Sequence, residues 1–197
     1  MKIIKNHNFN TNTPDIIKTM STWDMRNIYN FHRKIGNQQT PLLNLDSLAK
    51  RLGVANIFVK DESSRLGLHS FKPLGSSYAM YKQMQTSPTI NTFCTATDGN
   101  HGRSVAWMAK KLDKKAVVYV PVGTAISRMN AIKSEGAIVH VVNGTYDETV
   151  DKANLRCIKE NRMAGQNKWS LIQDTAWEGY EEIPLNIMKG YWTQIHE

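Results

Sequence analysis

Cysteine is scarce in this sequence, and no long apolar run occurs in it. The 197 residues include only two cysteines, Cys94 and Cys157, too few for a disulfide framework. Both lie among apolar residues, so we expect them to pack in the interior of a protein from a reduced compartment, the cytoplasm. No apolar run approaches the length of a membrane span, and residues 1–12 lack the apolar core of a signal peptide. We therefore expect no contact with a membrane.

Glycine-rich runs are also missing, because the 12 glycines are dispersed along the chain. The glycine fingerprint of dinucleotide binding does not occur, and no spacing of cysteine and histidine is typical of a zinc site. We expect neither a dinucleotide cofactor nor a metal ion. The 41% of hydrophobic residues and the 21% of charged residues are ordinary values for a folded protein.

Basic residues outnumber acidic ones, 25 to 17, which gives a formal charge of +8. Such an excess is one feature of nucleic-acid-binding proteins. The lysines and arginines are scattered, however, and no helix-turn-helix, zinc-finger or RNP pattern is present. We predict no nucleic-acid partner; the charge can equally reflect an anionic ligand or an acidic protein partner.

Short apolar strands alternate with longer helical segments along most of the chain. Residues 1–14 are expected to form an irregular arm. Helices are predicted at 21–34, 46–52, 72–84, 100–112, 125–134, 146–163 and within 180–197, where 187–197 has the pattern of one continuing helix. Strands are predicted at 57–59, 92–97, 116–120, 137–142 and 168–172. The alternation predicts an α/β fold: a three-layer parallel sheet with helices on both faces.

Ligands of such sheets bind beyond the carboxyl ends of the strands, which directs attention to the loops at 60–72, 97–100 and 173–179. The first loop ends at Lys72, with Pro73 in the first turn of the helix that follows. The positive end of a helix favours a neutral amine, which condensation with a carbonyl requires. An ordinary surface lysine is the alternative.

The second loop carries Asp98, Gly99 and Asn100 and opens a helix whose free backbone N–H groups can bind an anion. Asp98 is either a helix cap or a general acid or base near a bound amino acid. Asp174 in the third loop either caps the next segment or projects into the same cleft as Lys72 and Asp98.

Three segments together, 60–79 with its Phe71-Lys72 pair, 96–107 with DGNHGR and 173–184 with QDTAWEGY, resemble the diaminopropionate ammonia-lyases. These are fold type II enzymes that depend on pyridoxal 5'-phosphate, in the same group as tryptophan synthase β and threonine deaminase. The resemblance covers about residues 40–192, with the motifs in the same order and at similar spacing.

The resemblance implies cleavage of 2,3-diaminopropionate to pyruvate and two molecules of ammonia. Lys72 would hold the cofactor as an imine and remove the α-proton of one substrate enantiomer, and Asp98 would be the base for the other. Asp174 would orient the substrate amine. Asn100 would bond the cofactor's ring oxygen, and Gly99, Asn100 and His101 would form the loop that binds the substrate carboxylate.

Three small departures concern Pro73, Ser76 and the His69-Ser70 pair, where family members more often have other small residues. A larger one is that the family's glycine-rich phosphate loop and its partner to the pyridine nitrogen have no counterpart here. The resemblance implies three regions: an arm and part of the large domain at 1–71, a small domain at 72–163 and the start of the remaining large domain at 164–197. It implies an incomplete large domain, an N-terminal fragment of an enzyme that is a homodimer when whole, and a complementary C-terminal half as partner. The alternative is a non-catalytic remnant or a split-enzyme subunit that has no activity alone.

Overall fold

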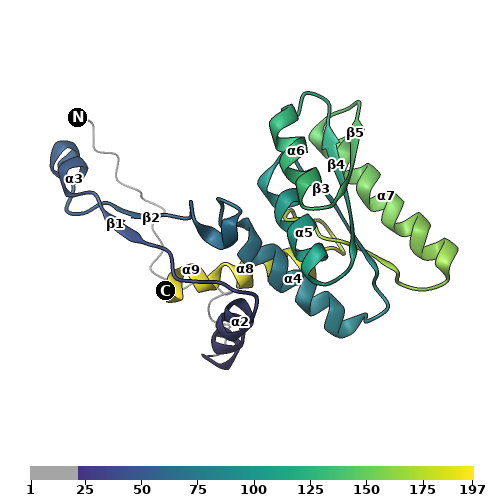
Figure 1. The fold of residues 1–197 in the computed structure, drawn as a ribbon, viewed down its shortest axis with the longest axis horizontal. Helices are drawn as coiled ribbons and strands as arrows, with labels where there is room; N and C mark the ends of the chain where they lie inside the picture. The colour runs from purple at the N-terminus through teal and green to yellow at the C-terminus, as the bar shows by residue number, and fades with distance from the viewer. Residues whose placement is uncertain (1–21) are drawn as a thin grey trace.

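The computed structural model describes residues 22–197, and its main body is a parallel sheet between two layers of helices (Figure 1). Its four strands follow the order β5-β4-β3-β6, and every neighbouring pair is parallel. Their bounds are β3 Thr92–Ala96, β4 Lys115–Pro121, β5 Ile138–Val142 and β6 Trp169–Leu171. The predicted α/β fold with a three-layer parallel sheet is confirmed. The arm predicted at 1–14 lies outside the described residues.

Alternate side chains of the central strands build a separate core on each face of the sheet, as the two-residue period of a strand requires. Phe93 and Val118 join a cluster with side chains of α4 (Lys72–Thr86), α5 (Asn100–Lys111) and α6 (Ile126–Ser134). Cys94 and Val117 join a second cluster with α7 (Tyr146–Ala164). Cys94 and Cys157 are buried and free, as expected. Helices on both faces explain why the strands are almost wholly apolar.

Glycines bring the backbones of α4 and α8 (Glu182–Gly190) into direct contact. A Cβ at Gly75 would lie 2.8 Å from the carbonyl oxygen of Ile187, and one at Gly190 would lie 2.8 Å from the Cα of Gly75. Distances below 3.0 Å leave no room for any side chain. The helix that begins at Lys72 is therefore held by main-chain contacts with α8.

The C-terminal helix is interrupted, so the prediction of one continuing helix at 187–197 was wrong. α8 ends at Gly190, Tyr191 forms a turn, and α9 spans Trp192–His196. Gly190 is required by the contact with α4 and is a weak helix former, which favours a break at this point. α9 lies against α2 (Thr22–Lys34), the helix predicted at 21–34.

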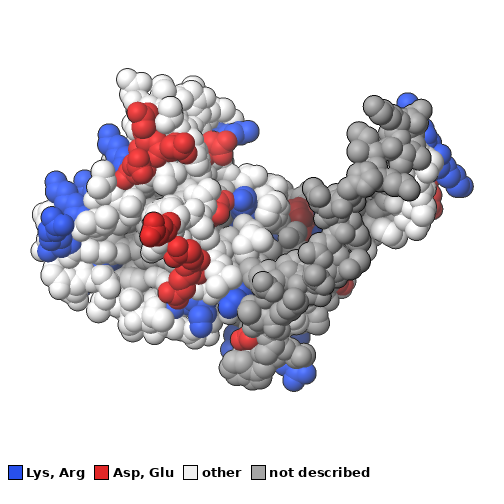
Figure 2. All heavy atoms as spheres, turned by 180° about the vertical axis from the view of Figure 1, so that it is seen from behind, with Lys and Arg blue, Asp and Glu red and all other residues white. Residues whose placement is uncertain are grey.

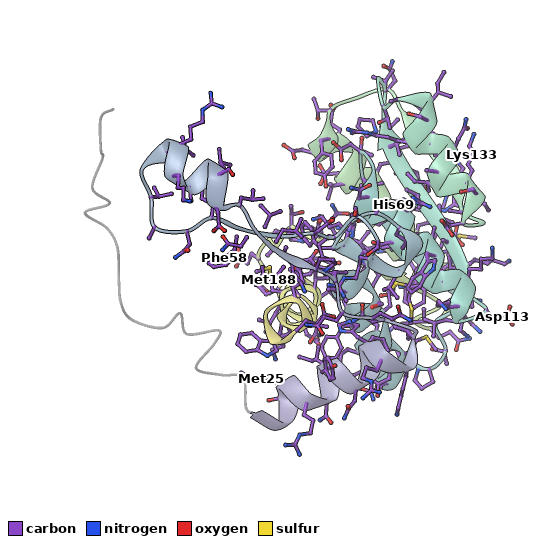
Figure 3. All side chains as sticks on the ribbon, turned by 60° about the vertical axis from the view of Figure 1, so that its left-hand side comes forward. Met25, Phe58, His69, Asp113, Lys133 and Met188 are labelled. Atoms are coloured by element: carbon purple, nitrogen blue, oxygen red, sulfur yellow. The ribbon has the colours of Figure 1, made fainter. Side chains whose placement is uncertain are left out.

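A protruding arm consists of β1 (Leu42–Asn44), α3 (Asp46–Leu52) and β2 (Phe58–Lys60) (Figure 1). The strand predicted at 57–59 exists, but it pairs antiparallel with β1, which was not predicted. It is not part of the parallel sheet, so the inference that loop 60–72 follows a strand of that sheet was wrong. Figure 3 shows Phe58 on this arm, and its side chain is 57% exposed.

An ion cluster joins the base of the arm to the end of α9. Arg65, in the short 3-10 helix η1 (Arg65–Gly67), is 1% exposed. Its guanidinium bonds Glu62 at 2.6 and 2.8 Å and both carboxylate oxygens of Glu197 at 2.8 Å. Lys60 Nζ lies 3.1 Å from Glu197 Oε2. Burial by itself would raise the pKa of Glu197, but the bonds from Arg65, Asn37 and Lys60 hold it at about 2.

A buried histidine joins α2, α4 and α9. His32 is 0% exposed; its Nδ1 lies 2.6 Å from Thr193 Oγ1 and its Nε2 lies 2.8 Å from the carbonyl oxygen of Leu74. Because a carbonyl only accepts, Nε2 carries the proton and Nδ1 accepts from the threonine hydroxyl. Burial lowers the pKa of His32 from 6.5 to about 4. The neutral ring is therefore the form that the fold requires.

Acid is expected to destabilise the fold through His32. The unfolded chain takes up a proton near pH 6.5 and the folded chain only near pH 4, so stability is full above pH 6.5 and falls as the pH decreases from 6.5 to 4. The full difference corresponds to roughly 3 kcal/mol. Urea unfolding at several pH values measures it, with His32→Gln as the matched control. An equally steep loss in His32→Gln would mean that other groups cause it.

Basic and acidic side chains are interspersed on the surface that Figure 2 shows. Lysine and arginine occur there in several separate groups, with acidic side chains between them. Among the helices of residues 22–197, none is long and apolar enough to cross a membrane.

Candidate active site

One cavity of about 300 Å³ brings together all the residues predicted to form the site. It lies at the carboxyl edge of the sheet, and its lining includes Lys72, Asp98, Gly99, Asn100, His101 and Asp174. These residues come from three segments far apart in the sequence: the start of α4, the β3–α5 turn and the loop after β6. A larger cavity of about 740 Å³ lies between α2 and α4, but none of the predicted site residues lines it.

Lys72 is the first residue of α4, and Pro73 follows it in the first turn, as predicted. The lysine side chain is 28% exposed, and Nζ donates to Asp174 Oδ2 at 2.7 Å. The preceding loop contains two non-glycine residues with positive φ, Leu66 at 50° and His69 at 60°. Such conformations are uncommon outside glycine and cost energy, which the surrounding contacts must offset.

Asp174 also faces a buried histidine. His101 Nε2 lies 2.7 Å from the carbonyl oxygen of Ile172, so Nε2 carries the proton. Its Nδ1 is buried without a hydrogen-bond partner, 3.6 Å from Asp174 Oδ2. Burial lowers the pKa of His101, so the ring is neutral near pH 7. Burial alone would raise the pKa of Asp174, but the adjacent His101 ring when it is protonated, the hydrogen bond from Lys72 and the positive charge of Lys72 outweigh it and lower the pKa.

Asp98 does not cap α5, so that interpretation of the residue was wrong. The capping oxygen is Thr97 Oγ1, which accepts from the backbone N–H groups of Gly99 at 2.9 Å and Gly102 at 3.2 Å. The Asp98 side chain is 73% exposed, and its Oδ2 lies 3.7 Å from Arg128 Nη1. Because Thr97 accepts from these two N–H groups, the Asp98 carboxylate is not needed as the cap and remains available to the cavity.

Sequence reasoning missed Arg128 and Tyr146, which line the cavity and lie outside the three loops singled out. Arg128 is on α6, and Tyr146 begins α7 after β5. The rule that sites form beyond strand ends was applied to three loops and not to the loops after β4 and β5, which carry these residues. The same rule, applied to every predicted strand, would have included Tyr146 and the region of Arg128.

Comparison with known proteins shows to which family the chain belongs. The family model described as pyridoxal-phosphate dependent enzyme matches residues 34–195. The chain belongs to this family. The family's cofactor is pyridoxal phosphate, and the resemblance noted in the sequence is thereby confirmed at family level.

Diaminopropionate ammonia-lyases are among the curated relatives of the chain. The enzyme of Salmonella typhimurium is 44% identical over 185 residues, which cover 83% of this chain and 44% of the relative. That of Escherichia coli strain K12 is 43% identical over 185 residues, with 85% of this chain and 45% of the relative covered. This chain therefore spans about half the length of the curated relatives that it matches.

Solved structures that are similar to this chain also belong to pyridoxal-phosphate-dependent enzymes. Diaminopropionate ammonia lyase from Escherichia coli, in complex with an aminoacrylate-PLP azomethine reaction intermediate, superposes with a TM-score of 0.81 and 40% identity. That alignment covers 95% of this chain and 49% of the other. A pyridoxal 5'-phosphate-dependent aspartate racemase, 20% identical with a TM-score of 0.69, shares the fold. The fold type II prediction is confirmed.

The cavity fits the aldehyde side of pyridoxal phosphate. Lys72 supplies a partly exposed primary amine, the group that condenses with an aldehyde. The Asn100 side chain lines the cavity, is exposed and makes no hydrogen bond within the described part of the chain, so its amide can donate to a ring oxygen. His101 Nδ1 is an orphaned buried polar atom on the same wall. Within residues 22–197, no group of three or more His, Cys, Asp or Glu side chains could hold a metal ion.

Proposed function

We propose that this chain supplies the lysine wall of a pyridoxal-phosphate site that converts 2,3-diaminopropionate to pyruvate and ammonia. The observation that carries the proposal is the convergence of Lys72, Asp98 and Asp174 from three distant segments on one cavity. The relatives of 44% and 43% identity support the choice of substrate, because they are named diaminopropionate ammonia-lyases. Because the chain covers less than half of each relative, we propose this activity for it only together with the rest of such a site.

Lys72 is proposed to attach the cofactor and to remove the α-proton from one substrate enantiomer. When bound, the cofactor supplies an electron sink for the pair left on the α-carbon. Asp98 is proposed as the base for the other enantiomer. The two groups enter the cavity from different elements, because Lys72 belongs to α4 and Asp98 to the turn before α5. Bases on separate elements can reach opposite faces of one planar carbon centre.

The remaining roles concern binding. Asp174 is proposed to hold the substrate amine. Its lowered pKa keeps it anionic, and its hydrogen bond from Lys72 is released when the Lys72 amine condenses with the cofactor. Asn100 is proposed to bond the cofactor's ring oxygen. Gly99 is the N-cap of α5, and Asn100 and His101 begin its first turn; the positive end of this helix favours the substrate carboxylate.

We further propose a cytoplasmic role in amino-acid catabolism and a homodimer as the assembled state. The two buried free cysteines support a reduced compartment. The division into 1–71, 72–163 and 164–197 also remains a proposal. β6 pairs with β3, so the third region contributes a strand to the sheet of the second. A complementary C-terminal half is the proposed partner where the chain acts as a split enzyme.

The test is a pyridoxal-phosphate absorbance spectrum together with a pyruvate assay on D- and L-diaminopropionate. Both are recorded for the chain alone and for the chain combined with the C-terminal half of the Escherichia coli relative. We expect a cofactor band and pyruvate release in at least one of the two preparations. If neither preparation shows a cofactor band or releases pyruvate, the enzymatic proposal fails and the non-catalytic alternative stands. Activity that appears only with the added half identifies a split enzyme.

A further inference from the structure

A buried amide fixes the direction of one hydroxyl in the cavity. Gln173 is 0% exposed, and its Oε1 accepts from the backbone N–H of Ala96 at 3.0 Å and from Thr95 Oγ1 at 3.1 Å. The Ala96 N–H can only donate, so the atom facing it must be the amide oxygen. The Gln173 amide nitrogen therefore donates to the hydroxyl of Tyr146 at 2.8 Å.

The Tyr146 hydroxyl proton consequently has no partner within the described residues. The oxygen is committed as an acceptor from Gln173, and no acceptor within residues 22–197 receives its proton. Tyr146 is half-buried and lines the cavity together with Lys72 and Asp174. A hydroxyl held by its oxygen, with its proton unused beside a cavity, is arranged to donate to a ligand.

A second tyrosine of the same network shows the contrast. The Tyr180 hydroxyl accepts from the backbone N–H of Gln173 at 2.9 Å and donates to the carbonyl oxygen of Leu171 at 2.7 Å. Both of its hydrogen-bonding roles are used within the protein, so its task is structural. Tyr146 differs because its hydroxyl proton has no acceptor within the described residues, and this hydroxyl belongs to a residue that lines the cavity.

The charges nearby indicate what the hydroxyl meets. Burial, and then the negative charges of Asp174 and Asp98, raise the pKa of Tyr146, so it stays protonated. A position close to two carboxylates repels the carboxylate of an amino acid and attracts its amine. The substrate's carboxylate is better placed toward Arg128 and the N-terminus of α5. The substrate nitrogen is therefore the group placed next to Tyr146, and as a neutral amine it keeps the electron pair that accepts the hydroxyl proton.

We propose that Tyr146 donates the proton with which the β-nitrogen leaves; this rests on the proposed function. In that step the Cβ–N bond breaks, its electron pair goes to nitrogen, and the nitrogen takes the Tyr146 proton and departs as ammonia. The base, Lys72 or Asp98, has taken the α-proton, and the C–H electron pair forms the bond between the α- and β-carbons. The phenolate regains a proton from water, so one proton leaves carbon and one reaches nitrogen.

The test compares two leaving groups, in whichever preparation turns over diaminopropionate. Tyr146→Phe is assayed on diaminopropionate and on β-chloroalanine, whose chloride leaves without a proton. We expect kcat on diaminopropionate to fall about 100-fold or more and kcat on β-chloroalanine to change less than about threefold. The loss on diaminopropionate should also deepen as the pH rises and free amine replaces ammonium. The cofactor absorbance band should be unchanged.

Tyr180→Phe is the matched control, because it removes a hydroxyl from the same network without removing a proton that faces the cavity. It should lower stability and affect both substrates to the same extent. Equal losses on both substrates in Tyr146→Phe would overturn the proposal and assign Tyr146 a structural role. If the unsubstituted protein eliminates neither group, the proposed function itself fails.

Discussion

Lys72→Ala is expected to abolish pyruvate formation from diaminopropionate, with a loss on the order of 10³-fold or more. Two contributions disappear together, because the side chain supplies both the amine that condenses with the cofactor aldehyde and one of the two bases. The cofactor absorbance band should vanish as well. Stability should change by less than about 1 kcal/mol, because the lost ion pair with Asp174 is partly exposed.

Lys72→Arg separates the two properties of this residue. Arginine keeps a positive charge that can pair with Asp174, but its guanidinium does not lose a proton near neutral pH and cannot condense with an aldehyde. We expect Lys72→Arg to be as inactive as Lys72→Ala. Pyruvate formation and absorbance spectra measure both variants. Substantial activity in the arginine variant would show that the charge of Lys72, and not its amine, is what the site requires.

Arg65→Met is expected to lower the free energy of unfolding by about 3 to 5 kcal/mol. The substitution removes the guanidinium that donates to all four carboxylate oxygens of Glu62 and Glu197. Their side chains are only 12% and 1% exposed, so water compensates little. Burial and the missing bonds should also raise the pKa of Glu197 from about 2 toward its unfolded value of 4.5, so the loss of stability that the unsubstituted protein shows as the pH falls from 4.5 to 2 should become smaller in the variant.

Urea unfolding of three variants tests this result. Arg65→Lys retains the charge without the planar fork and should lose less than Arg65→Met. Adding Glu197→Gln to Arg65→Met removes one of the unpaired charges and should restore part of the stability. A loss below about 1 kcal/mol in Arg65→Met would mean that the cluster is solvated like an ordinary surface ion pair.

The sheet could be predicted from sequence because its strands are buried on both faces. A continuous apolar run such as 117–120 is typical of a strand covered by helices on both sides, and glycine or proline marks the ends of several such runs. The position of Lys72 at the start of a helix was also predictable, because Pro73 is favoured in the first turn of a helix. The meeting of Asp98 and Asp174 on one cavity followed from the general position of ligands in parallel sheets, whereas Lys72 reaches the same cavity from a loop that follows no strand of that sheet.

Features set by contacts between distant segments could not be predicted in this way. Arg65 stands in a polar loop and resembles a surface residue, and only the arrival of Glu197 and Asn37 makes its burial possible. β1 is three residues long and exists because β2 pairs with it. The capping of α5 by Thr97 depended on a turn geometry that sequence spacing alone does not separate from capping by Asp98.

The glycine contact between α4 and α8 has a mechanical consequence for the reactive amine. Gly75 lies one helical turn beyond Lys72 and rests on the main chain of Ile187, so no rotamer change can loosen the support. Rotamer changes of neighbouring side chains therefore have little effect on the position of the Lys72 main chain. A rigid-body shift of the C-terminal helices, by contrast, would move the main chain of Lys72 and change how far its amine extends into the cavity.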